Sequence, residues 1–378
     1  MVVLEEQKQA FADATEGENG GAPMALFAMV TVQFDVKRTE CACKQQSSRM
    51  WSQPHGFWEE KMGSEFFKKA VAVTALAMLM GTASASATNV AWVHSNAAAQ
   101  SEQRAKAGFD AWLKETNKDW SISVLDSGGS GERTASNIQD AASRGVDAII
   151  VSMSDLRASR AAIDSAVAAK IPVFAIDSGQ VDGVVVDVTT NNWAMSADVS
   201  PFLLNEMGGK GNLVFLRMAE HHGTRKRGDV METVLKEYPE VKVIAEHNID
   251  YTAFFEDTTK TMQDYASRFG EEINAVWAPW DEPAQAAINA LNAAGLKNVK
   301  VIGIDGHPQA IEEVCKPDSL MIATVSQPFE KMGAQTGEWI ESIVVKKEDA
   351  AKVIPSKTVY LDAPLVTKQN CKDFLPKK

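Results

Sequence analysis

Short apolar runs alternate with amphipathic stretches along most of the chain, and this alternation constrains the fold more than any other feature of the sequence. The runs NVAWVHS, DAIIVSM and IPVFAID have the length and composition of buried strands. The stretch SEQRAKAGFDAWLKET, which follows the first of them, spaces its apolar residues as an amphipathic helix does. Strands that alternate with helices form βαβ units and a parallel sheet, whose strands are apolar throughout because helices cover both faces. The sequence therefore predicts an α/β fold.

The same alternation occurs a second time, which indicates two lobes. The later set contains the strands GNLVFLRM, KVIAEHNID, INAVWAPWD and VKVIGIDG, with helical stretches between them. One barrel of eight strand–helix units is the competing arrangement. The extended connection VDGVVVDVTTNNW at 181–193 has no helix between its ends, which breaks the rhythm of a barrel. We therefore expect two Rossmann-like lobes with parallel sheets, and we interpret this connection as a strand that leaves one lobe for the other.

Residues 62–87 have the pattern of a cleavable signal peptide. A pair of lysines precedes an apolar core at 70–80, and the small residues Ala-Ser-Ala at 85–87 match a signal-peptidase site. The core is shorter than the roughly 20 apolar residues of a membrane-spanning helix. We therefore expect export to the periplasm and cleavage before Thr88. A buried helix of a cytosolic protein is the alternative.

The stretch before the predicted signal peptide, residues 1–61, shows no sustained period. We interpret it as a misassigned start, with Met62 the true initiator, or as an unstructured extension; a genuine extension with its own role is the alternative. Two cysteines, Cys315 and Cys371, remain in the exported chain. In an oxidising compartment they can form a disulfide, or they can be two buried thiols.

Composition and motifs argue against several function classes. Of the 378 residues, 45% are hydrophobic and 23% are charged, as in soluble globular proteins. The net charge of −12 argues against nucleic acid as a partner, since proteins that bind it concentrate Lys and Arg. The glycine-rich DSGGSGER lacks the Lys-Ser/Thr ending of a phosphate-binding loop, and the adjacent His221 and His222 cannot both face one metal from a strand. We therefore expect no catalytic group, no cofactor and no metal.

Polar residues gather where the predicted strands end. In parallel α/β sheets, ligands bind beyond the carboxyl ends of the strands. The residues near these ends with groups suited to a ligand are Ser95, Asp177, Asn192, Arg225, Trp280, Asp281 and Asp305. Taken singly, each can be a helix cap or a solvated loop residue. Taken together, carboxylates, a guanidinium and an amide form directional bonds to vicinal hydroxyls, and an aromatic face covers the C–H patch of a sugar or polyol.

Five segments carry a resemblance to a known family. They are IPVFAID, TRKRG, WAPWDEPAQAAINAL, VIGIDGHPQA and TVSQPF, in this order behind the predicted signal peptide. In this combination the chain from Thr88 to Lys378 resembles the type I periplasmic sugar-binding proteins, the ribose- and galactose-binding group that serves ATP-binding-cassette importers. The resemblance implies two lobes joined by three hinge crossings, with a sugar or polyol clamped between them. We accordingly expect a monomeric binding protein without enzymatic activity, whose protein partner is the membrane permease of the importer.

The resemblance also sets the expected domain boundaries. The N-terminal lobe comprises 88–191 and 328–355, and the C-terminal lobe comprises 192–327 and 356–378. The last crossing between the lobes is therefore expected near Pro355.

Matched position by position, the resemblance assigns four polar site residues. The strand-end acid of the family corresponds to Asp177, and its amide at the first hinge crossing corresponds to Asn192. The acid of the IDG turn corresponds to Asp305, and the hinge amide of TVSQP corresponds to Gln327.

A cation and an aromatic complete the set. The sugar-clamping arginine corresponds to Arg225, the first arginine of TRKRG, and we expect Lys226 and Arg227 to be solvated. The aromatic of the second lobe corresponds to Phe254, with Phe255 as the alternative.

Two departures from the family leave the identity of the sugar open. Trp280 stands where the family commonly has an Asn before the Asp, and the polar run AAAQSEQ stands where ribose-type proteins carry paired aromatics. A furanosyl signalling molecule or an amino acid is the alternative ligand. A secreted sugar-modifying enzyme that uses Asp177 and Asp305 as an acid–base pair is an alternative function. A repressor of the same fold would need a helix-turn-helix before the first strand, where the predicted signal peptide stands instead.

Overall fold

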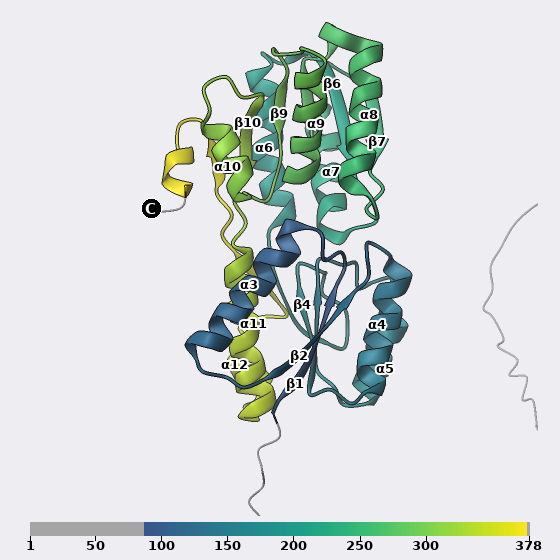
Figure 1. Cartoon of the computed structure of the whole chain (residues 1–378), viewed down its shortest axis with the longest axis vertical. Coiled ribbons are helices and arrows are strands. Elements are labelled where there is room, and N and C mark those ends of the chain that lie inside the picture. The colour runs from purple at the N-terminus through teal and green to yellow at the C-terminus, as the bar shows by residue number, and fades with distance from the viewer. Residues whose placement is uncertain (1–86, 376–378) are drawn as a thin grey trace, which may run out of the picture. The chain divides into compact units, whose positions relative to one another are not determined.

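The computed structural model describes residues 87–375. The predicted extension at 1–61 and all but the last residue of the predicted signal peptide at 62–87 lie outside the described residues. Within the described range the chain forms two six-stranded sheets, each packed between helices (Figure 1). The predicted fold class, α/β with two Rossmann-like lobes, is confirmed.

The first sheet has the strand order β11-β5-β4-β3-β1-β2, and its pairings are parallel. Its strands are β1 (Asn89–His94), β2 (Ser121–Asp126), β3 (Ala148–Ser152), β4 (Val173–Ile176), β5 (Val184–Thr190) and β11 (Thr358–Leu361). Its helices are α3 (Gln100–Glu115), α4 (Gly131–Ser143), α5 (Arg160–Ala168), α11 (Phe329–Ile340) and α12 (Ala350–Val353). Along β1, Val90 and Trp92 pack with α3 and α11, whereas Ala91 and Val93 pack with α4 and α5. Both faces of the sheet are therefore buried.

The second sheet has the order β12-β10-β9-β8-β6-β7, and only β12 within it is antiparallel to its neighbour. Its strands are β6 (Lys210–Arg217), β7 (Glu240–Asn248), β8 (Ala275–Trp277), β9 (Lys300–Ile302), β10 (Met321–Val325) and β12 (Leu365–Thr367). Its helices are α6 (Asn192–Glu206), α7 (His222–Leu235), α8 (Phe254–Phe269), α9 (Asp281–Ala293) and α10 (Pro308–Cys315). Helices α8, α9 and α10 share one core with this sheet, and α6 and α7 share the other.

Three crossings join the lobes within the described residues, between β5 and α6, between β10 and α11, and between β11 and β12. The third one corrects the predicted boundary at 355/356. The segment Thr358–Leu361 pairs in parallel with β5 and belongs to the first lobe, so the crossing follows Leu361. β11 is a partly exposed edge strand, and it therefore lacks the apolar run that marks an inner strand.

Helices α3 and α11 pack with their backbones in contact. A Cβ added at Gly108 would lie 1.9 Å from the carbonyl oxygen of Glu330, and one added at Gly333 would lie 1.9 Å from that of Ala105. Only glycine permits so close an approach. Because α11 directly follows the second crossing, this contact anchors that end of the hinge to the first lobe.

A disulfide joins Cys315 at the end of α10 to Cys371 in the short helix η3 (Cys371–Phe374), with their Cα atoms 5.6 Å apart. Of the two possibilities that the sequence leaves open, the structure has the disulfide. It ties the C-terminal segment to the second lobe.

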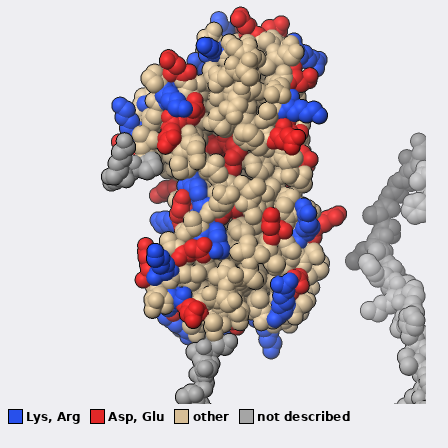
Figure 2. Space-filling model, in the orientation of Figure 1, with Lys and Arg blue, Asp and Glu red and all other residues tan. Residues whose placement is uncertain are grey.

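Acidic and basic side chains are interspersed over the face of the molecule seen in Figure 2, without a broad basic surface. Among the described residues, no helix has the length and apolar character needed to cross a membrane.

Candidate functional site

Asp177 directly follows β4 and lines a cavity between the two lobes. Its carboxylate accepts hydrogen bonds from the Thr189 hydroxyl at 2.5 Å and from the Asn192 side-chain amide at 2.9 Å. Burial acts to raise the pKa of Asp177, but His221 and Arg227 act to lower it, and the net pKa lies below the usual range. The pKa of His221 is itself about 4, so Arg227 is the charge that matters at neutral pH. Asp177 is therefore an ionised acceptor.

Asp305 is the matching acid of the second lobe, and it links residues of the first two hinge crossings to the same arginine. Its Oδ1 accepts from Gln327 Nε2 at 2.6 Å and from an Arg227 guanidinium nitrogen at 3.2 Å. Gln327 in turn accepts a hydrogen bond from the hydroxyl of Thr190, which ends β5. Burial raises the pKa of Asp305 to about 7 against the opposing charges of Arg227 and His307. This acid is consequently less firmly ionised than Asp177.

Arg227 occupies the centre of this network, which corrects the expectation that it is solvated. Its side chain is only 2% exposed and lies 4.0 Å from the Asp177 carboxylate. It donates to Asn192 Oδ1 at 2.8 Å and to the Pro279 carbonyl oxygen at 2.7 Å. Two of its nitrogens are thus held by neutral acceptors, and the guanidinium is fixed between acids of opposite lobes.

Arg225, the predicted clamp, lies instead at the rim of the site. It pairs with Asp155 of the first lobe at 2.8 Å, and its side chain is 23% exposed. The periodicity of α7 explains the difference, because Thr224, Arg227 and Met231 share the buried face of this helix. That spacing of three and four residues is a signal in the sequence that distinguishes the two arginines.

His221 is a candidate site residue that the sequence analysis does not include. It lines the cavity beside Asp177 and offers a ring nitrogen to a ligand. Its Nδ1 accepts from the backbone N–H groups of Gly223 and Thr224 at 3.0 and 3.3 Å, which caps α7. Burial lowers the pKa of His221 to about 4, so the ring is neutral and its proton sits on Nε2. This Nε2 is buried and has no hydrogen-bond partner among the described residues. Because His221 also lines the cavity beside Asp177, it offers a donor to a ligand.

Trp280 packs edge to face against two other aromatic rings of the second lobe. The Trp280 ring centroid lies 5.8 Å from that of Phe254 and 6.0 Å from that of Tyr251. Trp280 and Tyr251 line the cavity, while Phe254 packs behind them in the core. Phe255, the alternative to Phe254, is 43% exposed and points away from this core.

Ser95 lies at the end of β1, where its backbone N–H donates to Glu102 Oε1 at 2.7 Å. Glu102 is completely buried and also bonds His94 and Ser152, so it holds this strand end in place. Ser95 is 7% exposed and faces the mouth of the site rather than its centre.

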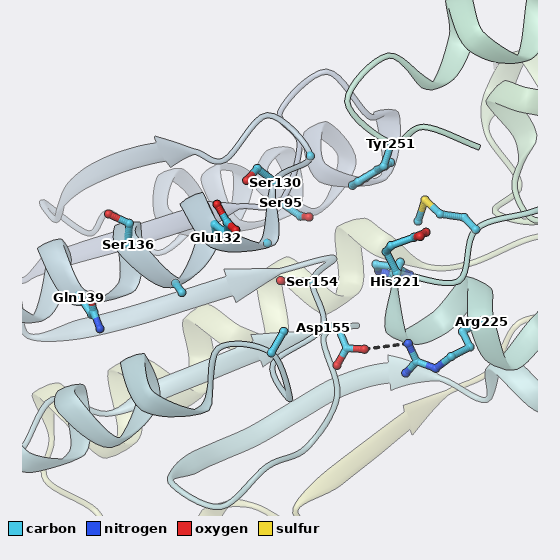
Figure 3. Close-up of a pocket in the computed structure, with 16 residues that line it drawn as sticks. Ser95, Ser130, Glu132, Ser136, Gln139, Ser154, Asp155, His221, Arg225 and Tyr251 are labelled. Atoms are coloured by element: carbon cyan, nitrogen blue, oxygen red, sulfur yellow. Dashed lines mark hydrogen bonds and ion pairs between the residues drawn. The ribbon is translucent and has the colours of Figure 1, made fainter. Parts of the chain in front are cut away.

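Two adjoining cavities lie between the lobes. The inner cavity, bounded by Asp177, Met218, His221, Arg227, Trp280 and Asp305 among others, has a volume of about 30 Å³. The outer pocket, bounded by Ser95, Ser136, Gln139, Asp155, His221 and Arg225 among others, has a volume of about 800 Å³ (Figure 3). The inner cavity has room for water but not for a sugar. A ligand between the two acids therefore requires their bonds to Arg227 to open.

A buried cluster of Glu282, Asp305 and His307 lies beneath the inner cavity, with ligating atoms within 4.8 Å of one another. His307 Nε2 bonds Glu282 at 2.9 Å and lies 3.6 Å from Asp305. Burial opposes the charged imidazole, but Glu282 and then Asp305 outweigh it and raise the pKa of His307 to about 9. His307 Nε2 is already bonded to Glu282, and Asp305 to Arg227 and Gln327, so the cluster fits an ion-pair network better than a metal site.

Comparison of the sequence with known families gives a result consistent with this two-lobed site. The family model of the periplasmic binding protein domain matches residues 90–349. The chain belongs to this family. A xylitol-binding protein of Mycolicibacterium smegmatis is 28% identical over 269 residues, which are 70% of this chain and 73% of that protein. A ribose import binding protein of Salmonella typhimurium is 28% identical over 266 residues, 69% of this chain and 85% of that protein.

Solved structures share the fold. A solute-binding protein of an ABC transporter from Agrobacterium vitis, crystallised with allitol, superposes with a TM-score of 0.68 at 24% identity, covering 76% of this chain and 97% of that one. The prediction of a solute-binding protein rather than an enzyme is confirmed by the family and its relatives.

Proposed function

We propose that the protein captures a neutral sugar or polyol between its lobes and delivers it to the permease of an ATP-binding-cassette importer. The observation that carries this proposal is the position of Arg227 between Asp177 of the first lobe and Asp305 of the second. Donors and acceptors fixed on both sides of a cleft can bond the vicinal hydroxyls of one ligand. Ligand binding then favours the closed arrangement of the lobes.

The charges around the inner cavity favour a neutral ligand. The ionised Asp177 is balanced by Arg227, and the pKa of Asp305 of about 7 leaves that acid partly protonated at neutral pH. His221 adds an uncharged donor. An amino acid would need separate fixed partners for its ammonium and carboxylate groups, and Arg227 is already shared between two acids. The named ligands of the relatives, xylitol, ribose and allitol, are neutral as well.

Each site residue has a role in this proposal. Asp177 accepts from ligand hydroxyls, while Arg227 and His221 donate to them. Trp280 and Tyr251 present aromatic surface to the C–H groups of the ligand. The residues that position these groups or flank them are Asn192, Asp305, Gln327, Phe254, Ser95 and Arg225.

The proposal includes the cellular setting. Export to the periplasm follows from the predicted signal peptide, and we expect the mature protein to be a monomer. N-terminal sequencing of the exported protein should find Thr88 as the first residue, and light scattering should give the mass of one chain. An exported product that begins elsewhere would change the leader assignment.

A thermal-shift screen over pentoses, hexoses, polyols and amino acids tests the ligand class. A ligand present at 100 times its dissociation constant stabilises a protein by about 2.7 kcal/mol. We expect at least one neutral sugar or polyol to raise the melting temperature and no amino acid to do so. The absence of any shift with sugars and polyols, or a shift with an amino acid alone, would contradict the proposal.

Product analysis separates binding from catalysis. After long incubation with the protein, a bound sugar should be recovered unchanged by mass spectrometry. Any product whose formation depends on Asp177 and Asp305 would favour the sugar-modifying enzyme instead.

A further inference from the structure

The outer pocket is continuous with the inner cavity. Met218, His221 and Tyr251 line both of them. Its volume of about 800 Å³ falls within the range of small-molecule sites, roughly 300–1,000 Å³. In Figure 3, His221 and Tyr251 approach the pocket from the second lobe, opposite Ser95 and Ser130 of the first. A ligand group that leaves the inner cavity past His221 therefore enters the outer pocket.

Contacts between the lobes border this space on two sides. Asp155 and Arg225 form their ion pair across it at 2.8 Å (Figure 3). Elsewhere on its border, Asn96 Nδ2 donates to the Tyr251 carbonyl oxygen at 2.9 Å, and a Cβ at Gly129 would lie 2.8 Å from the same oxygen. The lobes are thus in contact around this space, and the outer pocket remains open between them.

One face of α4 forms a wall of the outer pocket. Glu132, Ala135, Ser136 and Gln139 follow the i, i+3, i+4, i+7 spacing of a single helix face, and all four line the pocket. The side chains of Glu132, Ser136 and Gln139 make no hydrogen bond to any described residue in the structure. They offer a carboxylate, a hydroxyl and an amide to whatever occupies the pocket. Small residues such as Ala135 and Ala158 leave the room for it.

The charges of the outer pocket restrict its occupant. Asp155 is paired with both Arg225 and Arg157, so its negative charge is offset. Glu132 and Glu220 also line the pocket, and neither forms an ion pair with a described residue. The net negative charge disfavours a phosphate or carboxylate group, whereas hydroxyls of a neutral ring can donate to these carboxylates.

We propose that the outer pocket is a second subsite, which takes a neutral sugar ring or glycosidic substituent attached to the sugar in the inner cavity. The preferred ligand is then a glycoside or disaccharide rather than a free monosaccharide. This inference rests on the proposed function, because it assumes that a sugar occupies the inner cavity once the bonds of Asp177 and Asp305 to Arg227 have opened.

Isothermal titration calorimetry on the mature protein tests the subsite with matched pairs of ligands. The probes are ribose, xylose, glucose and galactose, the methyl and phenyl glycosides of each, and the disaccharides cellobiose and lactose. We expect at least one glycoside or disaccharide to bind ten or more times tighter than its parent sugar. If every substituted sugar binds as weakly as its parent or more weakly, the outer pocket is only an entrance and the subsite is refuted.

Filling the outer pocket supplies the second arm. In Ser136→Trp, the ratio of glycoside affinity to parent affinity should fall at least tenfold, because the indole occupies the space of the second ring. Ser143→Trp places the same side chain on the same helix one turn beyond Gln139 and should leave the ratio unchanged. Gln139→Ala, which adds no bulk, should lower the ratio about threefold and guards against misfolding of the tryptophan variant.

The outcomes distinguish the subsite from the function beneath it. An unchanged ratio in both Ser136→Trp and Gln139→Ala overturns the subsite, even where free sugars bind. Failure of every probe, free or substituted, to bind the wild-type protein overturns the proposed function itself.

Discussion

Glu282 of the second lobe accepts a hydrogen bond from the backbone N–H of Gln100 in the first lobe, at 2.9 Å. Gln100 is the first residue of α3, whose N-cap position holds Ala99 and has no side-chain cap. Glu282 therefore caps a helix of the opposite lobe, and its negative charge suits the positive end of the helix dipole. The same carboxylate bonds His307, next to the ligand-site acid Asp305. These contacts connect the ligand site to the interface that forms when the two lobes close.

Replacing Glu282 with Ala should weaken ligand binding mainly by speeding dissociation. Loss of a cap costs roughly 0.5–2 kcal/mol, which corresponds to about a two- to thirtyfold weaker affinity when the cap exists only in the closed state. Stopped-flow dissociation of a ligand found in the screen measures this effect. Glu313→Ala on α10 is the control and should leave dissociation unchanged. A lowered melting temperature with unaltered dissociation would mean that Glu282 only stabilises the second lobe.

The fold could be predicted from the sequence because its strands are buried on both faces. Inner strands such as β3 and β4 are nearly continuous apolar runs. Asp177 directly follows β4, and Asp305 lies shortly after the end of β9, at the edge where a parallel sheet presents its ligand groups. The edge strand β11 has no such run, so the last crossing is misplaced by the sequence alone.

The motif TRKRG by itself could not show which of its two arginines, Arg225 or Arg227, enters the ligand site. Arg225 and Arg227 are both strong donors, and only the starting point and buried face of α7 decide which one enters the site. His221 is a different case. Its role depends on a tautomer fixed by two backbone N–H groups and on a buried Nε2, neither of which has a sequence pattern.

Arg227→Ala should weaken ligand binding far more than Arg225→Ala. Arg227 is buried among charged and neutral acceptors, and loss of a charge-assisted bond costs roughly 1.5–3 kcal/mol, or about ten- to hundredfold in affinity. Arg225 forms a partly exposed pair with Asp155, for which roughly 0.2–1 kcal/mol is usual. Calorimetric titration of both variants measures the difference.

Arg227→Lys serves as the control for charge. It keeps the positive charge but loses the planar fork, so its affinity should lie between those of the wild type and Arg227→Ala. Equal losses in Arg225→Ala and Arg227→Ala would contradict the central position of Arg227.

Removing the disulfide by the double change Cys315→Ser and Cys371→Ser should lower stability without much effect on the ligand. The two cysteines are 56 residues apart, and a loop of that size corresponds to an entropic stabilisation of about 4 kcal/mol at most. Urea unfolding should show a reduced midpoint, while the dissociation constant should change less than about threefold. A large loss of affinity in a variant that is still fully folded would show that the position of α10 affects the ligand site.

The stability of the protein should fall as the pH rises from about 6.5 to 9, because of His307. Burial opposes its protonation, but Glu282 and Asp305 hold the folded pKa at about 9, above the ordinary value of 6.5. A raised folded pKa contributes stability that is fully present below the unfolded pKa and is lost as the pH rises through the folded one. The raised pKa of Asp305 also makes stability fall as the pH rises, but it does so at lower pH, between 3.8 and about 7.

Urea midpoints measured at intervals from pH 6.5 to 9.5 test this prediction in the wild type and in His307→Gln. Glutamine keeps a hydrogen-bonding group beside Glu282 but carries no proton that titrates in this range, so its midpoint should decline less steeply. The variant should also be less stable than the wild type at pH 6.5, where the buried carboxylates lose a cation, and the two curves should approach each other toward pH 9.5. Parallel curves would show that His307 is not the titrating group, and the ion-pair network beneath the inner cavity would then have to hold a neutral imidazole.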